Sequence, residues 1–134
     1  MIKDIDRPKV EDIALAAVPE VGEGQEEAWY IYLMNLKEEK ISNVLISSRG
    51  YGKLKDEEVK TSELRHFLEE LPGNSFVKIE PIMEELFALN NQYWVSFYLQ
   101  DKLYDKKYVF LPETIQKSNL TEIPLMGQKG VLIV

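Results

Sequence analysis

Two runs of alternating apolar and polar residues late in the chain predict a β-hairpin. They lie in the stretch 93–111, YWVSFYLQDKLYDKKYVFL. If Asp101 and Lys102 form a two-residue turn, the numbers of facing residues sum to 203, so Phe97 faces Lys106. A four-residue turn would keep the same register.

The two faces of this hairpin differ in character. One is almost entirely apolar and is expected to join the core: Tyr93, Val95, Phe97, Leu99, Tyr104, Tyr108 and Phe110. The other is mixed: Trp94, Tyr98, Lys107 and Val109. Aromatic residues are enriched at interfaces, so we expect this mixed set to contact another protein chain. In the alternative, the apolar residues of the tail 112–134 cover it.

Other alternating or apolar runs predict further strands. They cover residues 10–18, 28–36, 41–49 and 76–79, with Pro19 and Pro81 ending the first and the last. The run 28–36 is apolar on both faces, which is typical of a central strand. Three segments are expected to be irregular: a flexible leader at 1–9, a loop at 49–58, and the tail, with a helical turn at 113–117.

The segment 60–71 fits two kinds of secondary structure. Its leucines and phenylalanine recur at helical spacing, with a serine available as a cap. As a strand, it instead places Leu64, His66 and Leu68 on one face. The turn residues Pro72–Asn74 follow directly and favour a strand–turn–strand unit.

Strands separated by turn signals, without regular strand and helix alternation, predict two packed antiparallel sheets. We therefore expect an all-β, immunoglobulin-like antiparallel sandwich of about seven strands. A helix at 60–71 would change the class to α+β.

The composition limits the domain count and the class of partner. The 134 residues, 45% of them hydrophobic, suffice for one packed core, so we expect a single domain, 1–134. The net charge is −7, of which residues 1–35 contribute −5. An acidic excess repels phosphate backbones and anionic lipids, which disfavours nucleic-acid and membrane partners.

Neither a signal peptide nor a membrane span is evident in the sequence. The first thirteen residues carry charges throughout, and no window approaches the roughly 18 uninterrupted apolar residues of a span. The chain has no cysteine, which fits a reducing compartment. We expect a cytoplasmic protein.

The chain lacks the residues needed for a zinc site, for thiol catalysis or for a well-supported Ser-His-Asp catalytic triad. One histidine and no cysteine cannot supply the three or four ligands of a zinc site. The histidine, His66, lies among apolar residues, which favours a structural role, and no G-x-S-x-G motif is present. Carboxylate pairs such as Glu57–Glu58, Glu69–Glu70 and Glu84–Glu85 are expected by chance among 23 acidic residues. We predict no metal, cofactor or catalytic residue.

Two short segments are similar to the strand motifs of an RNA-recognition motif. Residues 31–36 are IYLMNL and residues 49–52 are RGYG. Lys53 and Asp56 then stand where stacking aromatics are needed, and residues 37–48 are too few for the intervening helix and strand. One alternative function is an RNA-associated module. Its nucleic-acid contacts would be Arg49, Tyr51, Lys53 and Lys55.

Three stretches resemble a known family: SELRHFLEELPGNSFVKIEP (62–81), LNNQYWVSFYLQDKLYDKKYVFLP (89–112) and IPLMGQKGV (123–131). They are similar to short, uncharacterised bacterial β-rich proteins, some of which carry a phenylalanyl-tRNA synthetase label. That label would imply a tRNA-associated role. The chain contains neither the ATP-binding arginine motif nor the glycine-rich motif of a class II synthetase, so we expect no aminoacylation.

These observations favour a non-catalytic domain that acts through protein–protein contacts, with an unknown partner or with itself. The alternatives are an RNA-associated module and a carboxylate-dependent enzyme.

Overall fold

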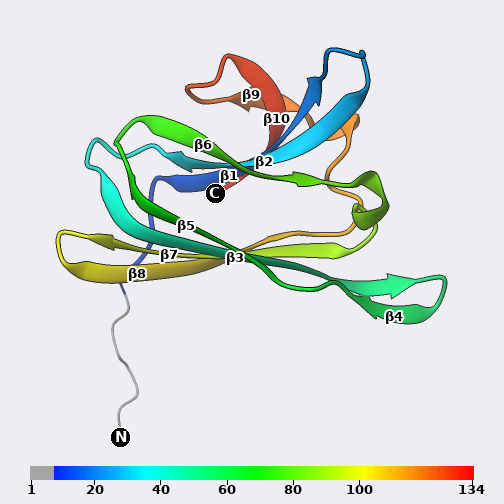
Figure 1. Ribbon diagram of the computed structural model, residues 1–134, viewed down its shortest axis with the longest axis horizontal. Helices are drawn as coiled ribbons and strands as arrows, with labels where there is room; N and C mark the ends of the chain where they lie inside the picture. Colours follow the sequence, from blue (N-terminus) through cyan, green and yellow to red (C-terminus); the bar gives the residue numbers. More distant parts are fainter. Residues whose placement is uncertain (1–7) are drawn as a thin grey trace, which may run out of the picture.

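The computed structural model describes residues 8–134, in which ten strands form a sandwich (Figure 1). The strands are β1 (Ile13–Val21), β2 (Glu27–Asn35), β3 (Ile41–Leu54), β4 (Glu57–Lys60), β5 (Leu64–Leu71), β6 (Ser75–Ile82), β7 (Asn90–Leu99), β8 (Lys102–Phe110), β9 (Thr121–Ile123) and β10 (Gln128–Ile133). Two short 3₁₀ helices, η1 (Glu84–Leu86) and η2 (Lys117–Asn119), lie in connections.

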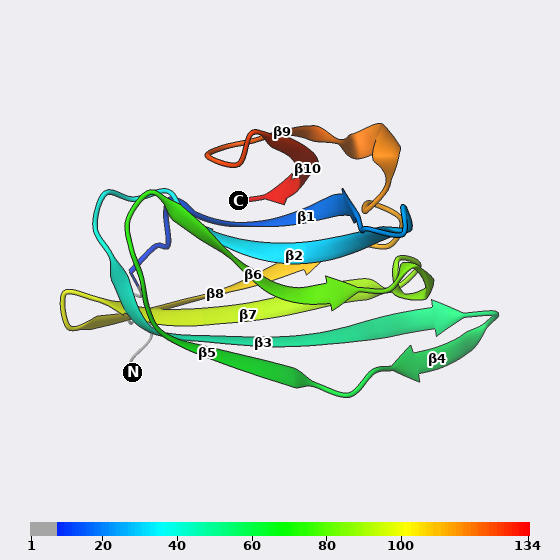
Figure 2. The same cartoon turned by 45° about the horizontal axis from the view of Figure 1, so that its top comes forward.

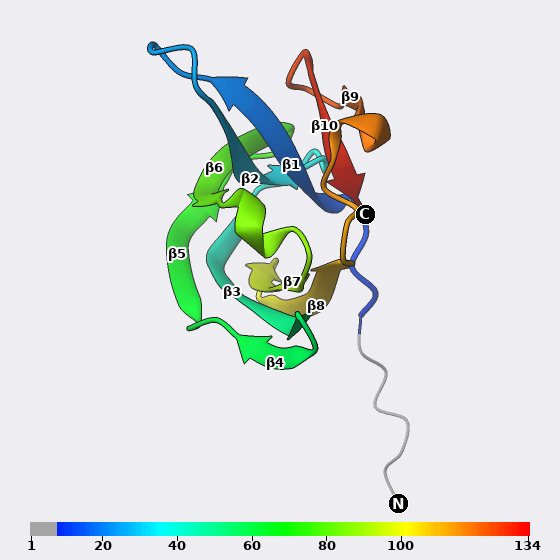
Figure 3. The ribbon, with the colours of Figure 1, turned by 90° about the vertical axis from the view of Figure 1, so that its right-hand side faces the viewer.

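The strands form two antiparallel sheets packed face to face (Figure 2). Sheet one has the order β6-β2-β1-β10-β9. Sheet two has the order β4-β3-β7-β8, and β5 also pairs with β3. The chain crosses between the layers from β5 to β6, which closes one side of the sandwich (Figure 3). The predicted all-β sandwich is confirmed, with ten strands rather than about seven.

The core lies between the sheets and follows the alternation of the strands. On sheet two, Tyr93, Val95 and Phe97 of β7 are buried. They pack in one cluster with residues of sheet one such as Leu15 and Leu33. The predicted inward face of the hairpin is therefore confirmed, and β2 is a central strand, as its two apolar faces indicate.

The turn of the β7–β8 hairpin lies earlier than predicted. Gln100 and Asp101 form it, with φ of 52° and 65°. Facing residue numbers therefore sum to 201, and Phe97 faces and stacks on Tyr104 instead of facing Lys106. Positive φ at both turn positions is the type I′ geometry, whose twist matches the strands. The predicted register was wrong by two residues, and a shift of two leaves every side chain on its expected face.

The ambiguous segment 60–71 is extended and contains β5. Its residues pair with β3 along 41–48, so the helical alternative is wrong. A few apolar residues at helical spacing are a weak signal. Here the segment is a strand because its backbone hydrogen-bonds to β3 along its length. The turn at Pro72–Asn74 is present, but β5 and β6 belong to different sheets.

Both strands predicted to end at a proline continue through it. β1 runs past Pro19 to Val21, and β6 runs past Pro81 to Ile82. β10 pairs only with Leu15–Ala17 of β1, so Pro19 has a neighbour strand on one side alone. β6 is the edge of sheet one. Proline has no backbone N–H to donate. It is tolerated at both positions because one side of the strand has no neighbouring strand there.

The two segments predicted to be loop and tail contribute strands. Residues 49–58 contain the end of β3, a turn through Lys55 and Asp56, and the start of β4. Residues 112–134 contain β9 and β10, which extend sheet one. The helical turn predicted at 113–117 was wrong, since the only helical residues in this described segment are those of η2. The leader 1–9 lies mostly outside the described residues.

Candidate functional site

The outer face of sheet two, which points away from sheet one, carries the residues predicted to contact a partner. Trp94 on β7 lies opposite Ser47 on β3 and Lys107 on β8, and Ser47 in turn lies opposite Arg65 on β5. Directly opposed residues of an antiparallel sheet share a face. Trp94 is 40% exposed, whereas its two chain neighbours are buried, so this row faces away from the core.

Large apolar side chains gather on this outer face. Five of them are exposed by the fractions that follow: Phe67 59%, Leu103 51%, Leu45 42%, Trp94 40% and Tyr98 39%. Leu45 lies opposite Phe67, and Tyr98 lies opposite Leu103. The five side chains come from four adjacent strands, and we call them the apolar patch.

The outer face of sheet one is covered over β1 and β2, in contrast, by the chain itself, whereas Phe76 at the β6 edge of that face is 39% exposed. Its alanines Ala14 and Ala16 are fully buried in a second cluster that includes Ile123 of β9. Gly130 of β10 is required for this approach, because a Cβ there would lie 2.7 Å from the carbonyl oxygen of Ala17. The C-terminal tail thus packs with sheet one. It does not cover Trp94, which was the alternative that the sequence left open.

The residues of the nucleic-acid alternative lie on a hairpin formed by β3 and β4, which extends beyond the sandwich (Figure 1). Arg49, Tyr51 and Lys53 alternate along β3, and the guanidinium of Arg49 lies 5.7 Å from the centre of the Tyr51 ring. Lys60 of β4 lies opposite Tyr51. Together with neighbouring residues they line a groove of about 370 Å³. Lys55 is in the turn and does not line it.

The two predicted sites are parts of one surface. Arg49 lies opposite Gln92, and Gln92 lies opposite Val109 on its other side. This row is two residues from the row of Trp94 and Lys107. The structure therefore brings Arg49 and Val109 onto the face that carries Trp94, although the sequence analysis treated them as separate candidates.

A second arrangement, between the sheets, was not predicted and centres on Glu80 of β6. Its carboxylate is 9% exposed and accepts hydrogen bonds from the Ser48 hydroxyl at 3.0 and 3.1 Å and from the Tyr93 hydroxyl at 3.0 Å. Nε2 of His66 lies 2.7 Å from Oε1 of Glu80. Glu80 belongs to sheet one and its three partners belong to sheet two, so the carboxylate links the layers.

The geometry of this cluster is that of a structural link. In a serine-protease-type triad the histidine stands between serine and carboxylate, whereas here Glu80 stands between Ser48 and His66. Burial raises the pKa of Tyr93 far above its usual range, and the adjacent Glu80 raises it further. Tyr93 is therefore a hydrogen-bond donor at neutral pH. His66 has the buried hydrogen-bond partner that a structural histidine needs.

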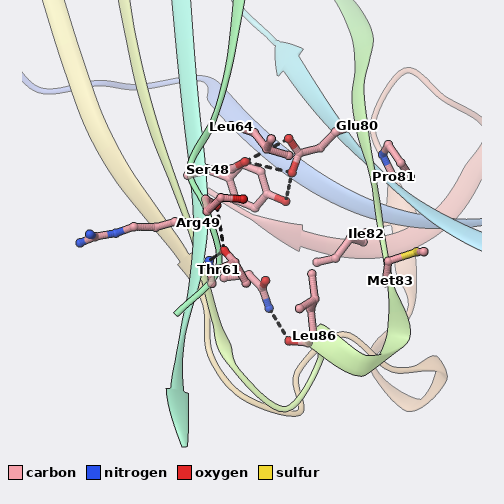
Figure 4. Close-up of a pocket in the computed structure, with 13 residues that line it drawn as sticks. Ser48, Arg49, Thr61, Leu64, Glu80, Pro81, Ile82, Met83 and Leu86 are labelled. Carbon is pink, nitrogen blue, oxygen red and sulfur yellow. Dashed lines mark hydrogen bonds between the residues drawn. The ribbon is translucent and has the colours of Figure 1, made fainter. Parts of the chain in front are cut away.

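A pocket of about 250 Å³ adjoins the Glu80 cluster (Figure 4). Glu80 is the one carboxylate among its lining residues, and Arg49 points away from the others. The Glu80 carboxylate has hydrogen-bond donors on both oxygens. The carboxylate pairs considered from the sequence, at 57–58, 69–70 and 84–85, are exposed on the surface.

A bulge in β6 sets the position of Glu80. Ile31 of β2 lies opposite Glu80, whereas the next residue, Tyr32, lies opposite Lys78. Plain alternation would place Glu80 on the outer face beside Lys78. The extra residue, Ile79, turns Glu80 inward.

Three further structural findings bear on function. Among residues 8–134, no group of three or more His, Asp or Glu side chains is placed to hold a metal ion. No helix in this part of the chain is long and apolar enough to cross a membrane. The two segments similar to an RNA-recognition motif lie on strands of different sheets, β2 in sheet one and β3 in sheet two, so they are not paired side by side in one sheet.

Comparison with models of protein families found no match, and comparison with curated proteins found no relative.

Proposed function

We propose that this chain is a non-catalytic binding domain that contacts another protein through the outer face of sheet two. The observation that carries the proposal is the apolar patch, five exposed large side chains on four adjacent strands. Single exposed apolar residues are ordinary on protein surfaces, but a contiguous patch is typical of an interaction site. The apolar residues of β1 and β2 on the outer face of sheet one are, in contrast, buried in a cluster with Ile123 of β9.

The immunoglobulin-like relationship is part of this proposal, and the strand order supports it. β2 pairs with β1 and β6, while β3, β7 and β8 are consecutive in the other sheet. These are the neighbours of strands A, B and E and of strands C, F and G in an immunoglobulin domain. Such sandwiches commonly serve as binding domains. We also propose a cytoplasmic location, which the absence of cysteine supports.

The experiment compares two serine substitutions that remove similar exposed apolar area from different sheets. Trp94→Ser alters the apolar patch, and Val21→Ser, at a residue 66% exposed at the end of β1, is the control. Each purified protein is used as bait in an extract of the native organism, and captured proteins are quantified. Thermal unfolding of both variants is measured in parallel.

We expect Trp94→Ser to lose partners that the wild-type protein and Val21→Ser retain. Its fall in stability should stay below the roughly 3–5 kcal/mol of a core aromatic residue, because Trp94 is 40% exposed. Equal capture by all three proteins would contradict the proposal. A fall in stability of about 5 kcal/mol or more for Trp94→Ser would also contradict it, because that result would place this side chain in the interior.

A further inference from the structure

The charge of the outer face of sheet two is opposite to that of the whole chain. The rows that pass through the patch and the β3–β4 hairpin contain five cations: Arg49, Lys53, Lys60, Arg65 and Lys107. The same rows contain three carboxylates, Asp105, Glu58 and Glu70. Five cations and three carboxylates give these rows a net charge of +2, whereas that of the chain is −7. A surface of this kind attracts and orients an anionic partner.

Three of the cations adjoin the apolar patch, and the other two, Lys53 and Lys60, lie farther along the β3–β4 hairpin. Arg65 and Lys107 lie at the two ends of the row that contains Trp94. The adjoining groove has three cations in its lining, Arg49, Lys53 and Lys60, and two carboxylates, Glu58 and Glu63. Among the described residues, only Arg65 of the five cations has a carboxylate within salt-bridge distance, namely Glu63. An apolar centre with cations at its rim is the usual organisation of an interface that selects a charged partner.

We propose that the partner docking on this face is an acidic protein surface, with carboxylates that meet Arg49, Lys60 and Lys107 and apolar side chains that meet the patch. This inference rests on the proposed function and names the chemistry of its partner. Symmetric pairing of this face with itself would bring +2 against +2, which disfavours a second copy in that arrangement.

The same face is poorly suited to a nucleic acid. Leucines occupy two of the five patch positions, and they offer no ring on which a base could stack. Asp105 and Glu58 lie among the cations, where they would repel a chain with one phosphate per nucleotide. A protein partner, in contrast, can carry its carboxylates at positions that meet the cations and stay away from Asp105 and Glu58.

Trp94 provides an intrinsic signal for the test. The other tryptophan, Trp29, is 3% exposed, so quenching of fluorescence by acrylamide reports mainly on Trp94. The probe is a synthetic twelve-residue peptide in which Asp and Glu alternate with Leu and Phe. The comparison probes are the same peptide with Lys in place of the acids, and a dT oligonucleotide.

Lys107→Glu tests the role of charge, and Lys129→Glu is its matched control. Both substitutions change the net charge by the same amount, but Lys129 is on β10 of sheet one. We expect the acidic peptide to protect Trp94 from acrylamide, with about tenfold weaker binding to Lys107→Glu and unchanged binding to Lys129→Glu. Salt should weaken binding to the wild-type protein and less so to Lys107→Glu.

Several results would overturn the inference. They are equal or tighter binding of the lysine peptide, tighter binding of the oligonucleotide, equal effects of the two charge reversals, and no acidic-peptide binding up to about 1 mM. Self-association that protects Trp94 while the peptide does not bind would assign the face to a second copy. If Trp94→Ser still loses its captured partners while the charge reversals have no effect, the proposed function stands and only the acidic partner is wrong.

Discussion

Removal of the Glu80 carboxylate should destabilise the fold strongly. In Glu80→Ala, the hydroxyls of Ser48 and Tyr93, both buried, lose their acceptor between the sheets. A hydrogen bond to a charged group contributes about 1.5–3 kcal/mol, and a buried donor left without a partner is itself costly. Three such partners, one of them the half-buried His66, give an expected loss of about 3–5 kcal/mol.

The assay is equilibrium unfolding in urea, followed by fluorescence and circular dichroism. Glu84→Ala is the control, because Glu84 is exposed and has no side-chain hydrogen bond in the described part of the chain; it should cost about 0.5 kcal/mol or less. Tyr93→Phe removes a single donor and should cost about 1–2 kcal/mol.

A double-mutant cycle then isolates the link itself. Once Glu80 is alanine, Tyr93→Phe should cost less than it does alone, so the two losses should fall short of additivity by about 1 kcal/mol or more. A loss below about 1 kcal/mol for Glu80→Ala, or strictly additive losses in the cycle, would refute the structural role assigned to this carboxylate.

Three further predictions concern the tail, the buried tyrosines and the β7–β8 turn. Deletion of Gly127–Val134 removes β10 and its pairing with β1, and should cost at least about 3 kcal/mol in urea unfolding; an unchanged midpoint would contradict this pairing. Burial raises the pKa values of Tyr93 and Tyr108 above their ordinary value of about 10, so the stability that these neutral hydroxyls provide is complete below pH 10 and is lost as the pH rises above it. The urea midpoint should therefore begin to fall at about pH 10 and continue to fall above it, and Tyr108→Phe should reduce that fall; a midpoint independent of pH would contradict the burial of both hydroxyls. Replacement of Gln100 and Asp101 by Asn and Gly, which favour the type I′ turn, should raise stability by about 0.5–1 kcal/mol; a loss would mean that the turn is not the one observed.

The sequence by itself determined the class of fold and the two faces of the β7–β8 hairpin. Alternation has a period of two, and the true register differs from the predicted one by two residues. Tyr93, Val95 and Phe97 are therefore buried, and Trp94 and Tyr98 exposed, as the pattern predicts. Side-chain alternation is local to a strand, so it does not depend on knowing the partner residue.

Only the tertiary structure decided which segments pair and which surfaces are covered. Residues 64–71 are a strand because β3 supplies their backbone partners, and the tail covers sheet one because Gly130 allows close approach to β1. A single bulge at Ile79 directs the Glu80 side chain between the sheets, where it links them, instead of onto the surface. Arg49 and Trp94 share a face because β3 and β7, about 40 residues apart in sequence, are neighbours in sheet two. Pairings over such separations are fixed by the packing of the whole chain, which no local pattern of residues specifies.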